Sequence, residues 1–165
     1  KRSTDLISAF ALARSQGANL RLTIVGNGPL LPALQAEVDE VEGACLLPRV
    51  DDVPEFLRTA DVFALVSDHE AAPRALLEAM ATGLACCVTS VGGMPESLQA
   101  TVGEPGVEPA GELVRPRDVP ELAAALRRLA GDPARRATLG ERARVRAADF
   151  SADEEWRQHV RLWGQ

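Results

Sequence analysis

The sequence has no apolar stretch long enough to span a membrane and no basic tract. It also contains very little lysine. Every apolar run falls well short of the roughly 20 residues that cross a bilayer as a helix, and none is laid out like a signal peptide. The formal net charge is −6, which argues against a nucleic-acid partner. Lys1 is the one lysine among 18 basic residues. We therefore expect a cytoplasmic protein with no transmembrane segment and no bound DNA or RNA.

The sequence is also poor in groups that hold metals or form disulfides. Its three cysteines are Cys45, Cys86 and Cys87, two of them adjacent, and none has the spacing of metal ligands. No Asp-x-Asp motif and no His/Cys cluster is present. We expect three buried thiols in a reducing compartment, no metal ion and no cofactor.

What the sequence does contain is a regular alternation of short apolar runs and amphipathic stretches over 165 residues, the size of a single domain. The patterns predict strands over 20–26, 44–48, 61–67, 85–90 and 112–114, and helices over 3–15, 29–41, 53–60, 73–82, near 95, over 118–130, from 133 and from 151. Apolar strands separated by helices indicate a parallel sheet covered on both faces. We predict an α/β fold, a Rossmann-like doubly wound parallel sheet.

Unusual residues gather in four segments that directly follow predicted strands, namely 26–29, 48–52, 67–73 and 91–95. Because ligands bind outside the carboxyl ends of parallel strands, we expect these segments to meet at one edge of the sheet. The turn with Gly26 and Gly28 is either a plain strand-to-helix connection or a place of close approach to a ligand. Gly92 and Gly93 likewise form either a tight turn or, with the following helix start, an anion site.

The stretch EAAPRALLE places Glu70 and Glu78 eight positions apart. In one continuous helix the two acids would lie roughly 12 Å apart along the axis, too far to share a small ligand. Pro73, however, favours a helix start, which puts Glu70 in a loop and Glu78 in the second turn. Ala72 then falls at the N-cap, where it leaves the first amides open. Glu78 is either a buried functional acid or a surface partner of Arg74.

The segment SDHEAAPRALLEAMATGLACCVTSVGGMPE resembles the signature of the group 1 glycosyltransferases (family 4), which are retaining GT-B enzymes with a nucleotide-sugar donor. Its Glu, seven residues, Glu pattern and its Gly-Gly-x-Pro-Glu turn match Glu70, Glu78, Gly92, Gly93, Pro95 and Glu96. LTIVGNGPLLPALQ, the segment from GELV to GERAR and the final FS…W helix resemble further family segments. The resemblance implies that residues 1–165 are a single donor-binding domain, the C-terminal half of a GT-B architecture. The first strand and the N-terminal acceptor domain are then expected outside this sequence.

The resemblance also implies roles for individual residues. Glu78 would accept hydrogen bonds from the donor ribose, Glu70 would meet the donor sugar as the candidate catalytic residue, and Lys1 would bind the diphosphate. The backbone near Arg49 and Val50 would flank the base, and the amides after Glu70, at Ala71 and Ala72, and around Gly92 and Gly93 would lie near the sugar and diphosphate. The remaining implied donor-binding residues are Gly26, Gly28 and Glu96. Ala71 departs from the family, which has Gly after the first Glu, so we expect a displaced loop or an altered sugar contact.

Two other functions stay open at this point. The chain could be a nucleotide- or phosphate-binding module that transfers nothing, or a GT-B-like sugar-nucleotide epimerase. UDP, GDP and ADP sugars are all candidate donors. Any contact with a membrane would come from the half that is expected outside this sequence.

Overall fold

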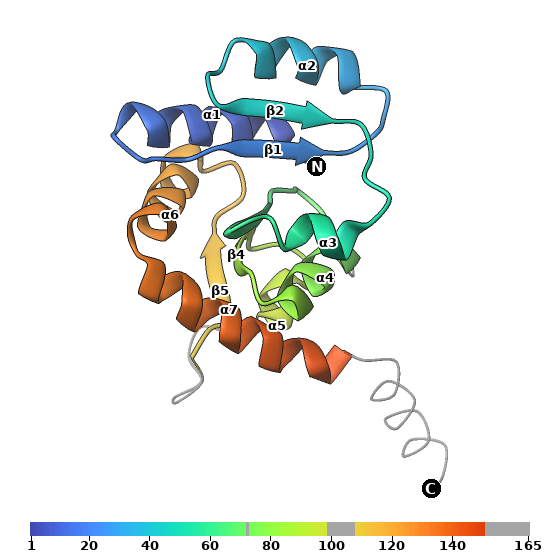
Figure 1. Ribbon diagram of the computed structural model, residues 1–165, viewed down its shortest axis with the longest axis vertical. Coiled ribbons are helices and arrows are strands. Elements are labelled where there is room, and N and C mark those ends of the chain that lie inside the picture. The colour runs from blue at the N-terminus through green and yellow to red at the C-terminus, as the bar shows by residue number, and fades with distance from the viewer. Residues whose placement is uncertain (72, 99–107, 151–165) are drawn as a thin grey trace, which may run out of the picture.

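The computed structural model describes residues 1–71, 73–98 and 108–150 (Figure 1). The elements run in the order α1 (Ser3–Ser15), β1 (Leu22–Val25), α2 (Leu31–Asp39), β2 (Ala44–Leu47), α3 (Val53–Leu57), β3 (Val62–Leu65), α4 (Arg74–Thr82), β4 (Ala85–Thr89), α5 (Met94–Ser97), β5 (Gly111–Val114), α6 (Val119–Gly131) and α7 (Pro133–Ala147), followed by a short 3-10 turn over Ala148–Phe150. Most of the predicted loop over 101–111, the predicted helix from 151 and Ala72 lie outside the described residues. None of the described helices is long and apolar enough to cross a bilayer.

The strands form two parallel sheets. β1 pairs with β2, with Leu22 opposite Ala44, and β4 lies between β3 and β5 in the other sheet. Figure 1 shows β1, β2 and α2 at one end of the molecule and α7 across the other end. The prediction of parallel strands is confirmed, but no ladder in the described chain joins β1 to β3, so the sheet is split. Beside β3, the N–H of Arg2 donates to the carbonyl of Val66 at 2.9 Å.

Helices cover both faces of the three-stranded sheet, as predicted for a doubly wound layer. One core cluster joins α1 and α6 to one face, and a second joins α4 and α5 to the other face, where α7 adds Ala143. β4 is buried along its whole length. Cys86 and Cys87 are adjacent residues of β4 but belong to different clusters, because successive side chains of a strand point to opposite faces. The centre of this sheet is therefore rigidly packed on both sides.

The smaller sheet is partly covered on one face and exposed on the other. In β2, Ala44 and Leu46 are partly buried, whereas Cys45 and Leu47 are exposed. The prediction of three buried thiols is therefore wrong for Cys45. Its position in an alternating strand turns its side chain outward, where its sulfur lies 3.3 Å from the hydroxyl of Thr23 on β1.

Several helix ends differ from the sequence-based expectation. Pro29 lies before α2, and Pro32 is the proline of its first turn. Pro73 is the N-cap of α4 and not its first helical residue, so the prediction that the N-cap is Ala72 is wrong. The helix ends at Thr82 as predicted, and Gly83 follows it in the left-handed region with φ 81°. The side chain of Asp118 caps α6, where it accepts a hydrogen bond from the N–H of Glu121 at 2.8 Å.

In a full capping box the carboxylate of Glu121 would accept a hydrogen bond from the N–H of Asp118, but that N–H donates to the carbonyl of Arg115 at 3.3 Å. The carboxylate of Glu121 turns instead to Arg115, whose backbone N–H donates to it at 2.9 Å. The guanidinium of the same arginine adds a second hydrogen bond at 2.9 Å. This pair ties the loop after β5 to the start of α6.

Candidate functional site

The loop after β3 sits directly on the glycine turn after β4. The N–H of Gly93 donates to the carbonyl oxygen of Glu70 at 3.2 Å. A Cβ at Gly92 would lie 1.6 Å from that oxygen, and a Cβ at Gly93 would lie 2.7 Å from the carbonyl oxygen of Ala71. Gly92 also has φ 53°, in the region that favours glycine. The two glycines thus allow backbone-to-backbone contact between the two loops.

This contact changes the interpretation of the glycine turn. The N–H of Gly93 is already used by Glu70, so it serves to seat the loop and is not available to an anion. The glycines act here mainly through their missing side chains, which bring the two predicted ligand loops together.

Basic side chains from other segments pair with the acidic side chains of the loop after β3. Lys1, ahead of α1, forms an ion pair with the carboxylate of Glu70, whose side chain is only 14% exposed. Arg117, in the loop after β5, donates from Nε and NH2 to the two carboxylate oxygens of Asp68, each at 3.1 Å. Arg2 lies 4.0 Å from Asp68 and is itself bound to Asp5. The hydrogen bonds from Arg117 hold the pKa of Asp68 below its ordinary value.

Lys1 and Glu70 were predicted site residues, whereas Arg2, Asp68 and Arg117 were missed. Arg117 follows the last predicted strand, so its place at the carboxyl edge was one available signal. Its partner is 49 positions away, which no local pattern reveals.

Glu78 lies in the second turn of α4 and is exposed, so of the two alternatives the buried acid is excluded. The buried residues of this nine-residue helix are Leu76, Ala79 and Met80, and Glu78 is exposed on another side. The alternative partner Arg74 forms no ion pair with it in the described structure. No side chain caps α4, so the start of this helix lacks a side-chain acceptor, as the sequence predicts.

The other predicted donor residues form a separate group beside the smaller sheet. Gly26 and Gly28 follow β1, Arg49 and Val50 follow β2, and the N–H of Gly26 donates to the carbonyl of Leu47 at 3.1 Å. A Cβ at Gly26 or Gly28 would meet nothing within 4 Å, so packing does not require glycine there. No hydrogen bond or ion pair of the described residues joins this group to the Glu70 loop.

Glu96 follows the glycine turn on α5, and in the described residues its side chain makes no hydrogen bond or ion pair with either group. It is exposed in the first turn of α5, and its carbonyl accepts a hydrogen bond from Arg146 on α7 at 3.1 Å. This bond ties the helix that follows the glycine turn to α7.

The order of these loops around a parallel sheet matches a known family. The family model described as glycosyl transferases group 1 matches residues 1–132. The chain belongs to the group 1 glycosyltransferases. This confirms the resemblance seen in the sequence and the expected fold, a Rossmann-like half of a GT-B architecture.

Individual relatives agree with this family and are considerably longer. N-acetyl-alpha-D-glucosaminyl L-malate synthase of Bacillus anthracis is 35% identical over 102 residues, which are 60% of this chain and 26% of that protein. Sucrose-phosphate synthase of Thermosynechococcus elongatus superposes with a TM-score of 0.76 at 26% identity, over 96% of this chain and 41% of that one. HepE of Anabaena, solved in complex with UDP and glucose, superposes with a TM-score of 0.71 at 23% identity, over 87% and 40% of the two chains.

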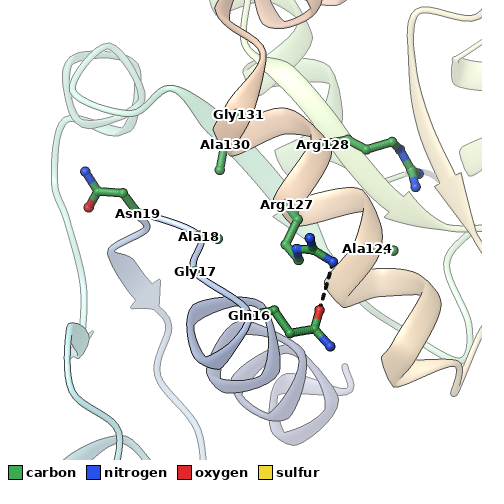
Figure 2. Close-up of a pocket in the computed structure, with 9 residues that line it drawn as sticks. All are labelled: Gln16, Gly17, Ala18, Asn19, Ala124, Arg127, Arg128, Ala130 and Gly131. Carbon is green, nitrogen blue, oxygen red and sulfur yellow. Dashed lines mark hydrogen bonds between the residues drawn. The ribbon is translucent and has the colours of Figure 1, made fainter.

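Elsewhere on this glycosyltransferase domain, a surface pocket of about 560 Å3 lies between the ends of α1 and α6 (Figure 2). Its walls include the Arg127 guanidinium, which donates to the side chain of Gln16 at 3.0 Å (Figure 2). None of the predicted site residues lines it. In the described ranges, no three His, Cys, Asp or Glu side chains gather as a group that could hold a metal ion.

Proposed function

We propose that this chain is the donor-binding part of a retaining glycosyltransferase, which moves a sugar from a nucleotide-diphosphate sugar to an acceptor. The observation that carries the proposal is the seating of the Glu70 loop on Gly92 and Gly93, with Lys1 on the Glu70 carboxylate. It brings an acid, a cation and a glycine turn together in a chain of the group 1 family. The UDP bound by HepE supports a nucleotide as the leaving part of the donor.

Lys1 and Glu70 take complementary roles in this proposal. The Lys1 side chain is 55% exposed, so its ammonium can turn from Glu70 to the donor diphosphate without leaving a buried cavity. Glu70, released from Lys1, then faces the sugar as the candidate catalytic residue, where its carboxylate can accept hydrogen bonds from the sugar hydroxyls. Ala71, Ala72 and Glu96 complete the sugar and diphosphate side.

Glu78 is proposed to bind the ribose hydroxyls. Its exposed carboxylate is free to accept them, and a charge-assisted hydrogen bond of this kind contributes about 1.5–3 kcal/mol once water is excluded. Gly26, Gly28, Arg49 and Val50 would flank the base. The proposal includes no metal, and Lys1 supplies the positive charge near the diphosphate. A cytoplasmic location stays a prediction.

We propose further that a strand formed by residues ahead of Lys1 belongs between β1 and β3. Three observations support it. Among the described residues β1 and β3 each pair along one edge only, and Arg2 bonds to Val66, the residue after β3. Leu22, Val62 and Ala64 also pack against the same core cluster. A separate acceptor-binding domain would account for the extra length of the relatives.

A thermal-shift panel of UDP, GDP and ADP with their sugars tests the donor site. A ligand at a hundred times its Kd adds about 2.7 kcal/mol to the free energy of unfolding, which raises the melting temperature by several degrees in a domain of this size. The proposal fails if no nucleotide shifts the melt and NMR titration also detects no binding.

Product analysis with the full-length natural chain separates the alternatives. Transfer of sugar to an acceptor supports the proposal. Conversion of the free nucleotide sugar to its epimer indicates an epimerase, and nucleotide binding with neither reaction indicates a binding module.

A further inference from the structure

The loop after β5 contains an arginine in a backbone conformation that suits glycine. Arg117 has φ 63°, and it is the one non-glycine residue with positive φ in the part of the chain that the structure describes. Side chains other than glycine rarely adopt this region, because the Cβ is crowded by the backbone. A residue held there against its preference points to a role for its side chain.

The side chain of Arg117 reaches across to the candidate site. Its two hydrogen bonds to Asp68, both at 3.1 Å, link the loop after β5 to the loop after β3. Asp68 precedes Glu70 by two positions. The planar guanidinium matches both oxygens of the carboxylate at once, so this contact fixes the orientation of Asp68 as well as its position.

The loop after β3 is also held by β4, by the glycine turn and by a hydrogen bond within the loop. The N–H of Ser67 donates to the hydroxyl of Thr89 on β4 at 3.0 Å, and the hydroxyl of Ser67 donates to the carbonyl of His69 at 3.0 Å. The carbonyl of Glu70 accepts from the glycine turn at 3.2 Å. Asp68 lies between these anchors, and Arg117 is the residue that binds it with two hydrogen bonds.

We propose that Arg117 is a positioning residue of the donor site, which holds Asp68 so that Glu70 stays on the glycine turn when a sugar nucleotide enters. The inference rests on the proposed function. Lys1 is expected to leave Glu70 for the diphosphate, and at that moment Arg117 keeps the loop in place. The effect is specific to the sugar, because Glu70 faces the sugar and the base and ribose bind elsewhere.

The test compares binding of a nucleotide diphosphate with binding of its sugar ester, by calorimetry on the full-length natural chain. The probes are UDP with UDP-glucose, GDP with GDP-mannose and ADP with ADP-glucose, and the pair in which the sugar adds affinity is used. Arg117→Gly removes the guanidinium and relaxes the backbone. We expect the Kd of the sugar nucleotide to rise about two- to fivefold, the range that exposed ion pairs reach, with the Kd of the bare nucleotide unchanged.

Stability should move independently of binding. The melting temperature of Arg117→Gly should stay level or rise, because glycine accepts the backbone conformation. Arg117→Lys should restore part of the sugar-nucleotide affinity. A double variant with Asp68→Asn should lose no more affinity than Arg117→Gly alone, because both changes break one contact.

A matched control comes from the same loop. Arg115 pairs with Asp118 at 2.7 Å and with Glu121 at 2.9 Å, away from Asp68, so Arg115→Gln should leave both Kd values unchanged. The proposal is wrong if Arg115→Gln has the same effect, or if the losses from Arg117→Gly and Asp68→Asn simply add. An equal loss for bare nucleotide would make Arg117 a direct phosphate ligand and would also overturn it.

Hydrogen exchange without ligand separates this inference from the proposed function. If Arg117 positions the loop, the amides of residues 68–71 exchange faster in Arg117→Gly and not in Arg115→Gln. Unchanged exchange contradicts the inference even if nucleotides bind. Faster exchange in a chain that binds no nucleotide supports the positioning contact and refutes the proposed function.

Discussion

The carbonyl oxygen of Glu70 lies 1.6 Å from the point where a Cβ of Gly92 would stand. No side chain, however small, fits at this position unless the loop after β3 moves. The glycine turn and the acid loop therefore form one unit, and a change in either should be felt in both.

Gly92→Ala should consequently disturb the site more than a surface substitution does. The added methyl forces the Glu70 loop away and also meets the positive φ of Gly92, so we expect a loss of about 1–3 kcal/mol in the free energy of unfolding and weaker donor binding. Gly131→Ala is the control, because a Cβ at Gly131 meets nothing within 4 Å at the end of α6. Urea unfolding and the thermal-shift panel measure the two effects. Equal stability of the two variants would contradict the close packing.

Glu70→Gln and Glu78→Gln should separate sugar recognition from nucleotide recognition. Glu78→Gln is expected to raise the Kd of the bare nucleotide roughly tenfold or more, since a charge-assisted hydrogen bond contributes about 1.5–3 kcal/mol. Glu70→Gln should leave the Kd of the bare nucleotide nearly unchanged and reduce the discrimination between donors that carry different sugars. Calorimetry with each nucleotide and its sugars measures both, with exposed Glu37→Gln on α2 as the control. If both variants lose the same affinity for the bare nucleotide, this division of roles is wrong.

Glu112 should make the stability of the chain depend on pH. Burial on β5 favours its neutral form, but hydrogen bonds from Arg128 at 2.9 Å and Arg135 at 2.7 Å outweigh burial and hold the pKa below 4.5. A lowered carboxyl pKa stabilises the fold above the unfolded-state value, and the contribution disappears as pH falls through the folded-state value. Urea unfolding should therefore show stability falling below about pH 4.5.

Glu112→Gln isolates this contribution. At pH 7 the variant should lose about 1–3 kcal/mol, because two arginines lose their charged acceptor. Its stability should also fall less on acidification than that of the wild type, while Glu37→Gln keeps the wild-type profile. If the free energy of unfolding of Glu112→Gln falls on acidification as steeply as that of the wild type, other carboxyl groups cause the pH dependence and the prediction is wrong.

The cysteines should differ sharply in reactivity. Burial raises the pKa of both Cys86 and Cys87 to about 12, so these thiols are protonated and shielded at pH 8. Cys45 is exposed. Iodoacetamide should give a single adduct at Cys45 in the native chain and three in urea, as measured by mass spectrometry. Native labelling of Cys87 at the rate of Cys45 would contradict the burial of β4.

Much of the fold was predictable from local patterns. The period of the apolar residues placed α1 over Ser3–Ser15 with the observed bounds, and the apolar runs located every described strand to within a few residues. Gly83 ended α4 as expected because glycine accepts the left-handed conformation there. These features depend on residues close together in the chain.

The errors concern relations that local patterns do not contain. A short helix such as α4 does not reveal which side will be covered, so the sequence left open whether Glu78 is buried or exposed. Cys45 was predicted to be buried because a strand covered on one face only looks apolar in sequence. The pairing of Arg117 with Asp68 depends on two loops meeting across the sheet, and only the three-dimensional structure brings them together.

The split between β1 and β3 affects how the chain unfolds. No ladder bond crosses the split in the described residues, so the smaller sheet and α2 are joined to the remainder through α1 and through side chains such as Leu20 and Leu22. Loss of α1 packing would release this end while β3, β4 and β5 keep their pairing. The melting of the chain by itself should thus proceed in two steps, and the order of those steps is set by a helix and not by the sheets it covers.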